Sequence, residues 1–265
     1  MEDINMLHLT ISAALQAGKA ILEIYYQDVA HPTFKADQSP LTIADLKANE
    51  IICQYLSDTG LPILSEETAI APYSERKEWQ KFWMVDPLDG TKEFIKRNGE
   101  FTVNIGLIEH GVPVLGVIYA PVLNLLYYGS NETGAFKVNN ASAFKTIEAL
   151  HKNSQQLPLA HHKNTFKIAV SRSHLDELTE IYLLQKAKEH KMNIETIAIG
   201  SSLKMCLVAE GSVNEYPRFG PTMEWDTAAG HAIVKAAGHT LTEIDNDREL
   251  HYNKKDLHNP YFICQ

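Results

Sequence analysis

The first half of the chain shows two kinds of apolar periodicity. From Leu7 to Leu22, apolar residues recur at the spacing of one helix face, which predicts an amphipathic helix over residues 4–26. Similar spacing predicts a second helix over residues 42–57. Short apolar runs and alternating apolar residues predict β-structure in three places: strands over 61–65 and 82–85, and an antiparallel sheet over 101–138. Residues 1–150 are therefore expected to form an α+β half.

A polar segment over residues 149–165, rich in histidine and asparagine, separates this half from a different pattern. Beyond it, strands and helices alternate: a strand over 167–171, a helix over 175–190, a strand over 194–199, a helix over 202–210, a strand over 213–216 and a helix over 225–237. Such alternation is typical of α/β structure. We therefore expect a layered α/β fold, with an N-terminal α+β half over 1–150 and a C-terminal α/β half over 166–265.

Composition and charge narrow the function classes. The chain has 265 residues, 45% hydrophobic and 22% charged, which is typical of a globular protein. No apolar stretch is long enough to span a bilayer, and the N-terminus lacks the layout of a signal peptide. A net charge of −9 argues against general nucleic-acid binding. The three cysteines cannot form a full disulfide set, so we expect free thiols in a reducing cytoplasm.

The segment WMVDPLDGT carries the strongest chemical signal. Its apolar strand ends on Asp86, and Pro87 is expected to stop the strand because it has no backbone N–H. A tight turn would then aim the carboxylates of Asp86 and Asp89 at one point. Gly90 and Thr91 follow, suited to close backbone approach and to a helix start with free N–H groups. The arrangement suggests a divalent metal ion with a phosphate, and its alternative is a structural turn.

Four further acidic residues are considered for the same site. Glu66 and Glu67 follow a predicted strand; either is a surface acid or an oxygen ligand for Mg²⁺. Asp45 lies three residues after Thr42, which imitates a capping box, and it is also placed to position a water molecule. Asp226 begins a predicted helix, where an acid favours the helix dipole. A metal ion or a basic partner would offset its burial beside a tryptophan.

Basic and hydroxyl residues in the second half are candidates for anion binding. Ser201 and Ser202 precede the helix that contains Lys204, so they either cap this helix or receive a phosphate or sugar. Arg218 lies in the segment EYPRFGPT, where a rigid loop could present its guanidinium as a bidentate fork to a phosphate. The alternative for Arg218 is a solvated side chain.

Together these motifs resemble the inositol monophosphatase family of metal-dependent, lithium-sensitive phosphatases. The signature D-P-L-D-G-T matches at residues 86–91 and W-D-x-A-A-G matches at residues 225–230, with S-E-E upstream at 65–67. The resemblance covers nearly the whole chain. It implies an αβαβα sandwich of the inositol monophosphatase and fructose-1,6-bisphosphatase type.

Other details resemble the CysQ-type 3′(2′),5′-bisphosphate nucleotidase branch of this family. The first signature continues as K-E-F, and the runs S-R-S-H at 171–174 and G-S-S-L-K at 200–204 also fit. Arg218 stands where inositol phosphatases carry an acid. That exchange is chemically reasonable, because a polyol hydroxyl prefers an acceptor whereas a second phosphate prefers a guanidinium.

The resemblance implies a role for each matching residue. The Mg²⁺ ligands would be Glu66, Asp86, Asp89, Asp226 and the carbonyl of Leu88, holding two or three ions. Thr91 and Asp45 would orient and deprotonate the attacking water. The amides of Gly90 and Thr91 would hold the scissile phosphate. The rest of the nucleotide would be bound by Ser201, Ser202, Lys204, Arg218 and Asp226.

The implied reaction is Mg²⁺-dependent hydrolysis of the 3′-phosphate of adenosine 3′,5′-bisphosphate to AMP and phosphate, in sulfur assimilation or nucleotide recycling. Two alternatives stay open: an inositol-phosphate or broad sugar-phosphate phosphatase on the same scaffold, and an inactive metal- or nucleotide-binding regulator. The expected partner is a small phosphorylated nucleotide, without nucleic acid and without stable membrane insertion. A homodimer and peripheral association with the inner membrane are left open.

Overall fold

The structure is a computed structural model of the chain and describes residues 2–27, 33–34, 40–159, 165–172, 176–190 and 194–265. Its central element is a seven-stranded sheet in the order β3-β4-β5-β6-β7-β8-β9. The strands are β3 (Ile63–Ser65), β4 (Lys81–Asp89), β5 (Thr102–Glu109), β6 (Val112–Ala120), β7 (Leu125–Ser130), β8 (Gly134–Asn139) and β9 (Gln155–Gln156). β3 and β4 are parallel, and the other neighbouring pairs are antiparallel.

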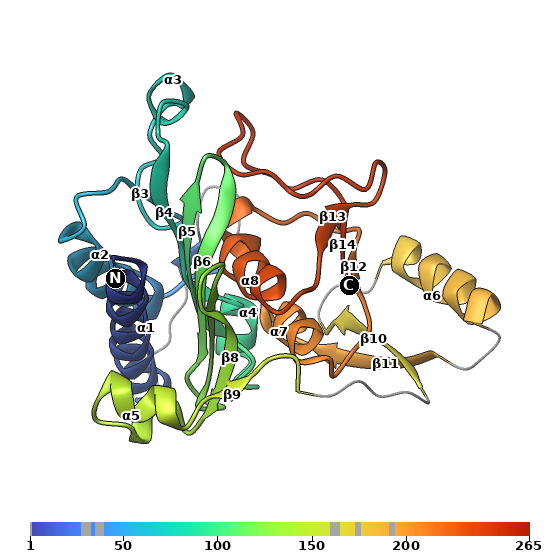
Figure 1. Ribbon diagram of the computed structural model, residues 1–265, viewed down its shortest axis with the longest axis horizontal. Helices are drawn as coiled ribbons and strands as arrows, with labels where there is room; N and C mark the ends of the chain where they lie inside the picture. The colour runs from blue at the N-terminus through green and yellow to red at the C-terminus, as the bar shows by residue number, and fades with distance from the viewer. Residues whose placement is uncertain (1, 28–32, 35–39, 160–164, 173–175, 191–193) are drawn as a thin grey trace.

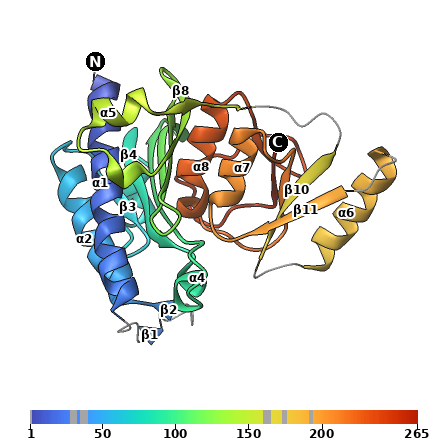
Figure 2. The ribbon, with the colours of Figure 1, turned by 90° about the horizontal axis from the view of Figure 1, so that it is seen from below.

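Helices cover both faces of this sheet. α1 (Glu2–Tyr26) and α2 (Ile43–Ser57) pack on one face, whereas α7 (Leu203–Glu210) and α8 (Glu224–Ala236) lie on the other (Figures 1 and 2). The alternation of side chains along β4 explains the two cores, because successive residues point to opposite faces. Trp83 and Val85 join the core under α1 and α2, while Phe82 and Met84 join the core under α8. The predicted helices and antiparallel sheet of the first half are confirmed.

The second half adds another β-layer and an outer helix. β10 (Phe166–Ser171) and β11 (Ile194–Ile199) are parallel, and α6 (Glu177–His190) forms the outermost layer in Figure 2. β12 (Tyr216–Arg218), β13 (Leu241–Glu243) and β14 (Phe262–Cys264) form an antiparallel sheet in the order β12-β14-β13. The short elements are β1 (Thr33–Phe34), β2 (Pro40–Leu41), α3 (Tyr73–Arg76), α4 (Thr91–Ile95), α5 (Ile147–Lys152) and a 3₁₀ turn (Ala141–Ala143). The layers therefore alternate between helix and strand, as expected for a layered α/β fold.

One expectation about the strand before the active-site motif is wrong. Pro87 does not end β4, which continues to Asp89. The pairing with β5 shifts between Asp86, opposite Asn104, and Asp89, opposite Thr102, so β4 carries one extra residue there. A β-bulge of this kind leaves a residue outside the ladder, which accommodates the missing N–H of proline.

Some other predictions differ from the structure in their details. The polar segment over 149–165 contains the end of α5 and the short strand β9, and residues 160–164 within it lie outside the described residues. The strand expected over 213–216 begins only at Tyr216, and β13 and β14 were not predicted. The start of the helix expected at 175 lies outside the described residues. The division into halves over 1–150 and 166–265 stays a prediction.

A row of glycines lets α8 lie close to the central sheet. Gly106, Gly116 and Gly129 are cross-strand partners on β5, β6 and β7. A Cβ atom added at Gly116 would stand 2.1 Å from the carbonyl oxygen of Ala229 in α8, and one added at Gly106 would stand 3.1 Å from the backbone of Ala228. The absence of side chains in this row therefore sets the depth of α8, whose first turn carries Asp226.

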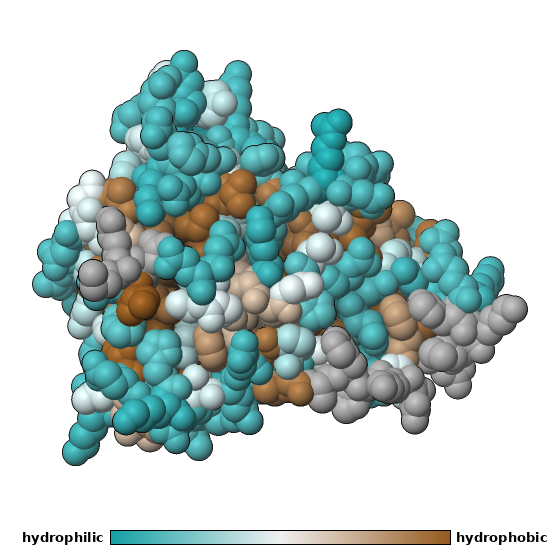
Figure 3. Space-filling view, in the orientation of Figure 1, coloured by the Kyte–Doolittle hydropathy of each residue, from teal (hydrophilic) through white to brown (hydrophobic). Residues whose placement is uncertain are grey.

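The described surface agrees with the composition. The face shown in Figure 3 is mainly hydrophilic, with apolar patches scattered between charged residues. Among the helices of the described ranges, none has the length and apolar character needed to cross a bilayer.

Candidate active site

The end of β4 places two carboxylates in the interior, where burial alters their acidity. The side chain of Asp86 is buried, and its Oδ1 accepts the amide of Leu88 at 3.1 Å. Burial raises the pKa of Asp86 well above its usual range, and the charges of Glu66 and Asp89 raise it further. Burial also raises the pKa of Asp89 to about 6, against the opposing effect of the Lys204 ammonium. A nearby positive charge would therefore stabilise the ionised form of both carboxylates.

Asp89 also joins β4 to the second half of the chain. Its Oδ2 accepts the amide of Ser202 at 2.6 Å and the side-chain amide of Asn104 at 3.4 Å. Ser202 belongs to the turn between β11 and α7, which we call the serine turn (residues 200–202). A candidate ligand from one half is thereby hydrogen-bonded to the candidate phosphate-binding turn of the other.

Asp45 combines the two roles considered for it. Its Oδ2 accepts the amide of Thr42 at 2.8 Å, which completes a capping box at the start of α2. Its Oδ1 lies 3.4 Å from Oγ1 of Thr91. Burial raises the pKa of Asp45, while the hydrogen bonds from Thr42 lower it. The cap holds the carboxylate in place, and its other oxygen faces the threonine of the signature.

Thr91 begins α4 directly after a glycine that the turn requires. Gly90 has φ of +92°, in the left-handed region that glycine adopts without a side-chain penalty. This conformation turns the chain from β4 into α4. It brings Oγ1 of Thr91 to 3.5 Å from the carbonyl of Leu88, the backbone oxygen expected to bind metal.

The remaining acids approach from two other elements. Glu66 extends the pairing of β3, since its amide donates to the carbonyl of Val85 at 3.1 Å, and its side chain is half-buried. Asp226 lies in the first turn of α8, and its Oδ2 accepts the amide of Met223 at 2.8 Å. Burial raises the pKa of Asp226 well above its usual range, and the Asp89 charge raises it further. The structure thus brings the acid that follows β3, the acids of β4 and the acid of α8 close enough for their charges to raise the pKa of Asp86 and Asp226.

These carboxylates have the chemistry that a hard divalent cation requires. The donors are all oxygens, they are largely buried, and their charges repel one another, so a cation would remove an unfavourable interaction. As the side chains lie, no three His, Cys, Asp or Glu residues in the described part of the chain enclose an ion. Four of them each use one oxygen for a hydrogen bond from a backbone amide: Asp45, Asp86, Asp89 and Asp226. The ligand assignments stay predictions.

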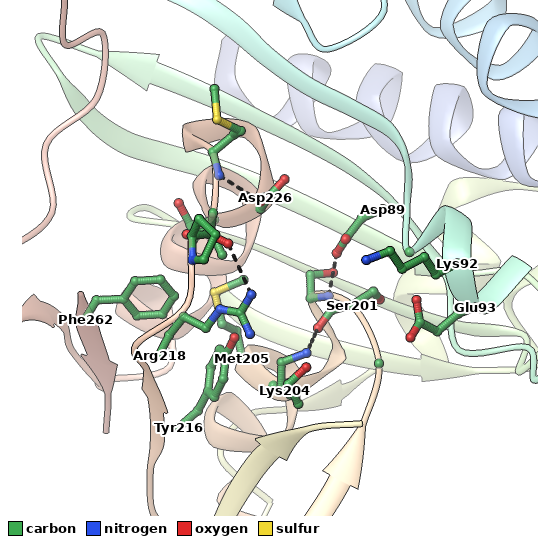
Figure 4. A pocket seen from close by; sticks show the side chains of 18 of the residues that line it. Asp89, Lys92, Glu93, Ser201, Lys204, Met205, Tyr216, Arg218, Asp226 and Phe262 are labelled. Carbon is green, nitrogen blue, oxygen red and sulfur yellow. Dashed lines mark hydrogen bonds between the residues drawn. The ribbon is translucent and has the colours of Figure 1, made fainter. Parts of the chain in front are cut away.

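A cavity of about 490 Å³ is lined by two of these acids, Asp89 and Asp226, and by the basic residues Lys204 and Arg218 of the second half. In Figure 4, Asp89 and Asp226 lie on one side of it, and Lys204 and Arg218 on the other. Burial lowers the pKa of Lys204 to about 8, and its ammonium donates to the carbonyl of Ser201 at 2.6 Å. The guanidinium of Arg218 donates to the carbonyl of Pro221 at 3.2 Å, while its buried Nε has no hydrogen-bond partner among the described residues.

The structure also shows site residues that were not singled out from the sequence. Lys92, Glu93, Tyr216, His258 and Phe262 line the cavity. Asn104 holds both Asp89 and the serine turn from β5. A signal existed for it, because Thr102 and Asn104 are polar at alternate positions of an otherwise apolar strand. The partner of this polar face is Ser202, however, which lies about a hundred positions away in the sequence.

Comparison with known proteins identifies the family of the chain. The model of the inositol monophosphatase family matches residues 4–264. The 3′(2′),5′-bisphosphate nucleotidases CysQ of Salmonella typhimurium and of Escherichia coli K12 are 50% and 48% identical to the chain over 239 and 238 residues, and each match covers 88% of both proteins.

Solved structures give the same result. The crystal structure of CysQ from Bacteroides thetaiotaomicron, described as a bacterial member of the inositol monophosphatase family, superposes with a TM-score of 0.91 at 49% identity. That match covers 98% of this chain and 97% of the other. An inositol monophosphatase of Thermotoga maritima, 21% identical over 100% and 92% of the two chains, superposes with a TM-score of 0.75 and supports the fold alone. The expected layered fold is confirmed, and the chain belongs to the inositol monophosphatase family.

Proposed function

We propose that the protein hydrolyses the 3′-phosphate of adenosine 3′,5′-bisphosphate, giving AMP and phosphate. One observation carries the proposal: a single cavity has two acids, Asp89 and Asp226, on one side and two cations, Lys204 and Arg218, on the other. A substrate with two phosphates can meet both sides at once. The bisphosphate nucleotidases that are about half identical to the chain support the same reaction.

The acids would hold the catalytic metal. In this proposal, two or three Mg²⁺ ions are bound by Glu66, Asp86, Asp89, Asp226 and the carbonyl of Leu88. Bound Mg²⁺ lowers the pKa of a water molecule and stabilises the departing alkoxide. Asp226 would also contact the substrate.

The protein's own groups would prepare the water and the scissile phosphate. Thr91 orients the water through its hydroxyl, and Asp45 accepts the proton through the carboxylate oxygen that faces Thr91. The amides of Gly90 and Thr91, at the start of α4, would hold the scissile phosphate.

The cations of the opposite side would select the second phosphate. Within the part of the chain that the structure describes, the buried Nε of Arg218 lacks a hydrogen-bond partner, and such a donor favours an anionic ligand. Lys204 adds a second positive charge, with its pKa lowered to about 8 by burial. Ser201 and Ser202 would add hydroxyl and amide contacts. Neither an inositol monophosphate nor a simple sugar phosphate uses this side fully.

A phosphate-release assay tests the proposal. The substrates are adenosine 3′,5′-bisphosphate, its 5′-phosphosulfate relative and inositol 1-phosphate, each with and without Mg²⁺. We expect Mg²⁺-dependent release with a preference for the two nucleotides, and Arg218→Glu should lower their turnover far more than that of inositol 1-phosphate. A preference for inositol 1-phosphate would support a polyol phosphatase, and no release from any substrate would support an inactive binding protein.

Cysteine chemistry supports a reducing cytoplasm as the place of action. The thiols of Cys206 and Cys264 are buried, that of Cys53 is half-buried, and all three are free. Burial raises the pKa of each, so the reactive thiolate is disfavoured.

A further inference from the structure

A polar face at the start of β5 holds the serine turn. It comprises Glu100, which lies two residues before the strand, and Thr102 and Asn104, whose side chains point to the same side because they are at alternate positions of β5. Oε2 of Glu100 accepts the amide of Gly200 at 2.8 Å. The hydroxyl of Thr102 lies 2.8 Å from that of Ser202, which in turn donates to Oδ1 of Asn104 at 2.8 Å. Each residue of this polar face therefore contacts the turn or its side chains.

Glu100 has a second partner in the outer β-layer. The guanidinium of Arg172, which follows β10, forms a bidentate pair with it: Nε to Oε2 and Nη2 to Oε1, both at 2.7 Å. Nη2 of Arg172 also donates to the carbonyl of Ala198 near the end of β11, at 2.6 Å. The glutamate thus fixes the end of β11 and the first amide of the turn that follows it.

The fit between Glu100 and the turn leaves no room for a side chain at Gly200. A Cβ atom there would lie 2.9 Å from the carbonyl oxygen of Glu100 and 2.8 Å from Cγ of Glu93. Ser201 adopts a positive φ of +46°, which non-glycine residues rarely do. Such a conformation persists only where surrounding contacts stabilise it. One of these contacts is the hydrogen bond from the ammonium of Lys204 to the carbonyl of Ser201.

We propose that Glu100 and Arg172 are positioning residues for substrate specificity. Their ion pair fixes the serine turn, and through it Ser201 and Lys204, at the place where a second phosphate binds. The inference rests on the proposed function for the identity of that ligand. Neither Glu100 nor Arg172 lines the cavity. Replacing either residue should therefore weaken binding of the second phosphate more than it slows the chemical step.

The test compares Glu100→Gln with the wild type on two substrates, adenosine 3′,5′-bisphosphate and adenosine 3′-monophosphate. Loss of the negative charge weakens both the bidentate pair with Arg172 and the hydrogen bond from the amide of Gly200. We expect KM for the bisphosphate to rise roughly tenfold, the effect of one charge-assisted hydrogen bond. Its kcat and the kcat/KM for the monophosphate should stay within about twofold. Equal losses on both substrates, or a fall in kcat alone, would overturn the proposal.

Two further variants separate positioning from a general loss of stability. Arg172→Lys keeps the positive charge but loses the fork, so it should give a smaller change in the same direction. Lys167→Gln is the matched control, because it breaks an ion pair between β10 and β11, Lys167 to Glu195 at 3.3 Å, that does not involve the serine turn. This control should leave the substrate preference unchanged. Comparing its melting temperature with that of Glu100→Gln shows how much stability each variant loses.

The affinity for AMP, measured by calorimetry, tests the positioning role without relying on turnover. AMP carries only the 5′-phosphate, so its Kd should rise roughly tenfold in Glu100→Gln and stay unchanged in Lys167→Gln. A wild type that binds AMP but does not hydrolyse the bisphosphate would refute the proposed function and leave the positioning role standing. An AMP affinity that Glu100→Gln leaves unchanged would refute the positioning role.

Discussion

Lys204 shows how burial gives a residue a pH-dependent role. Its side chain is buried, its ammonium donates to the carbonyl of Ser201, and its charge opposes the raised pKa of Asp89. Burial lowers the pKa of Lys204 to about 8, so the residue is charged below that pH and loses its charge above it. An anionic substrate should therefore meet a less favourable site in alkaline solution.

This pH dependence can be isolated with Lys204→Arg, since an arginine stays charged throughout. The ratio of kcat/KM between wild type and variant should fall as the pH rises from about 7 to about 9. The fall should appear in kcat/KM, which reports the free enzyme, more than in kcat. Lys167→Arg serves as the control on a lysine outside the cavity. A ratio that stays constant over this range would contradict the assigned role of Lys204.

At the scale of elements, the contact between α8 and the central sheet decides where Asp226 lies. On the sheet side of this contact, Gly106, Gly116 and Gly129 form a row without side chains. Alanines of α8 pack against this row. The packing is closest at Gly116. Any added side chain must push α8 away from the sheet, and Asp226 moves with it.

A series of alanine substitutions tests this geometry. Gly116→Ala should destabilise the protein by about 1–3 kcal/mol, the usual cost of overpacking a core. Gly106→Ala and Gly129→Ala should cost less, because their added Cβ atoms meet the nearest atoms at 3.1 Å rather than 2.1 Å. Urea denaturation measures the order, and Mg²⁺-dependent activity should fall most in Gly116→Ala. Equal effects at the three positions would rule out a special contact there.

Local patterns predicted most elements because helix and strand periodicity depends on neighbouring residues. The helices at 4–26 and 42–57 and the antiparallel sheet follow from such patterns, and the structure confirms them. The strand that passes Pro87 could not be predicted, since the bulge depends on pairing with β5. β13 and β14 are equally invisible locally: each is short and is stabilised by a partner far along the chain.

The same limit applies to the candidate site. The signature residues were found because their types and spacing are informative, and the structure brings their acids into electrostatic contact. Glu100 and Asn104 escaped notice because their partners lie on a turn about a hundred residues later. No spacing rule reports such a contact.

For the whole molecule, the acids of the candidate site oppose folding in the absence of metal. One follows β3 and the others belong to β4, α2 and α8, which lie in different layers, so their repulsion acts across the layered structure. A cation that binds only the folded state removes this repulsion and adds stability by mass action. Function and stability should therefore depend on the same ions.

Thermal unfolding with and without Mg²⁺ tests this link. At a concentration of 100 times its Kd, Mg²⁺ should add about 2.7 kcal/mol, which for a chain of this size raises Tm by roughly 5–10 °C. Asp89→Asn should raise the Tm of the metal-free protein, because one repelling charge is gone, and should reduce the Mg²⁺-induced shift. Its turnover should fall more than about 100-fold. A variant that keeps wild-type turnover would remove Asp89 from the metal site.

The double engagement of Asp89 has a thermodynamic consequence. One of its oxygens is hydrogen-bonded to the serine turn, while the carboxylate as a whole belongs to the proposed metal site. A change at either partner is therefore felt by the other. Linkage then requires reciprocity: the factor by which Mg²⁺ changes nucleotide affinity must equal the factor by which the nucleotide changes Mg²⁺ affinity. One carboxylate would make the cofactor and the substrate each other's effectors.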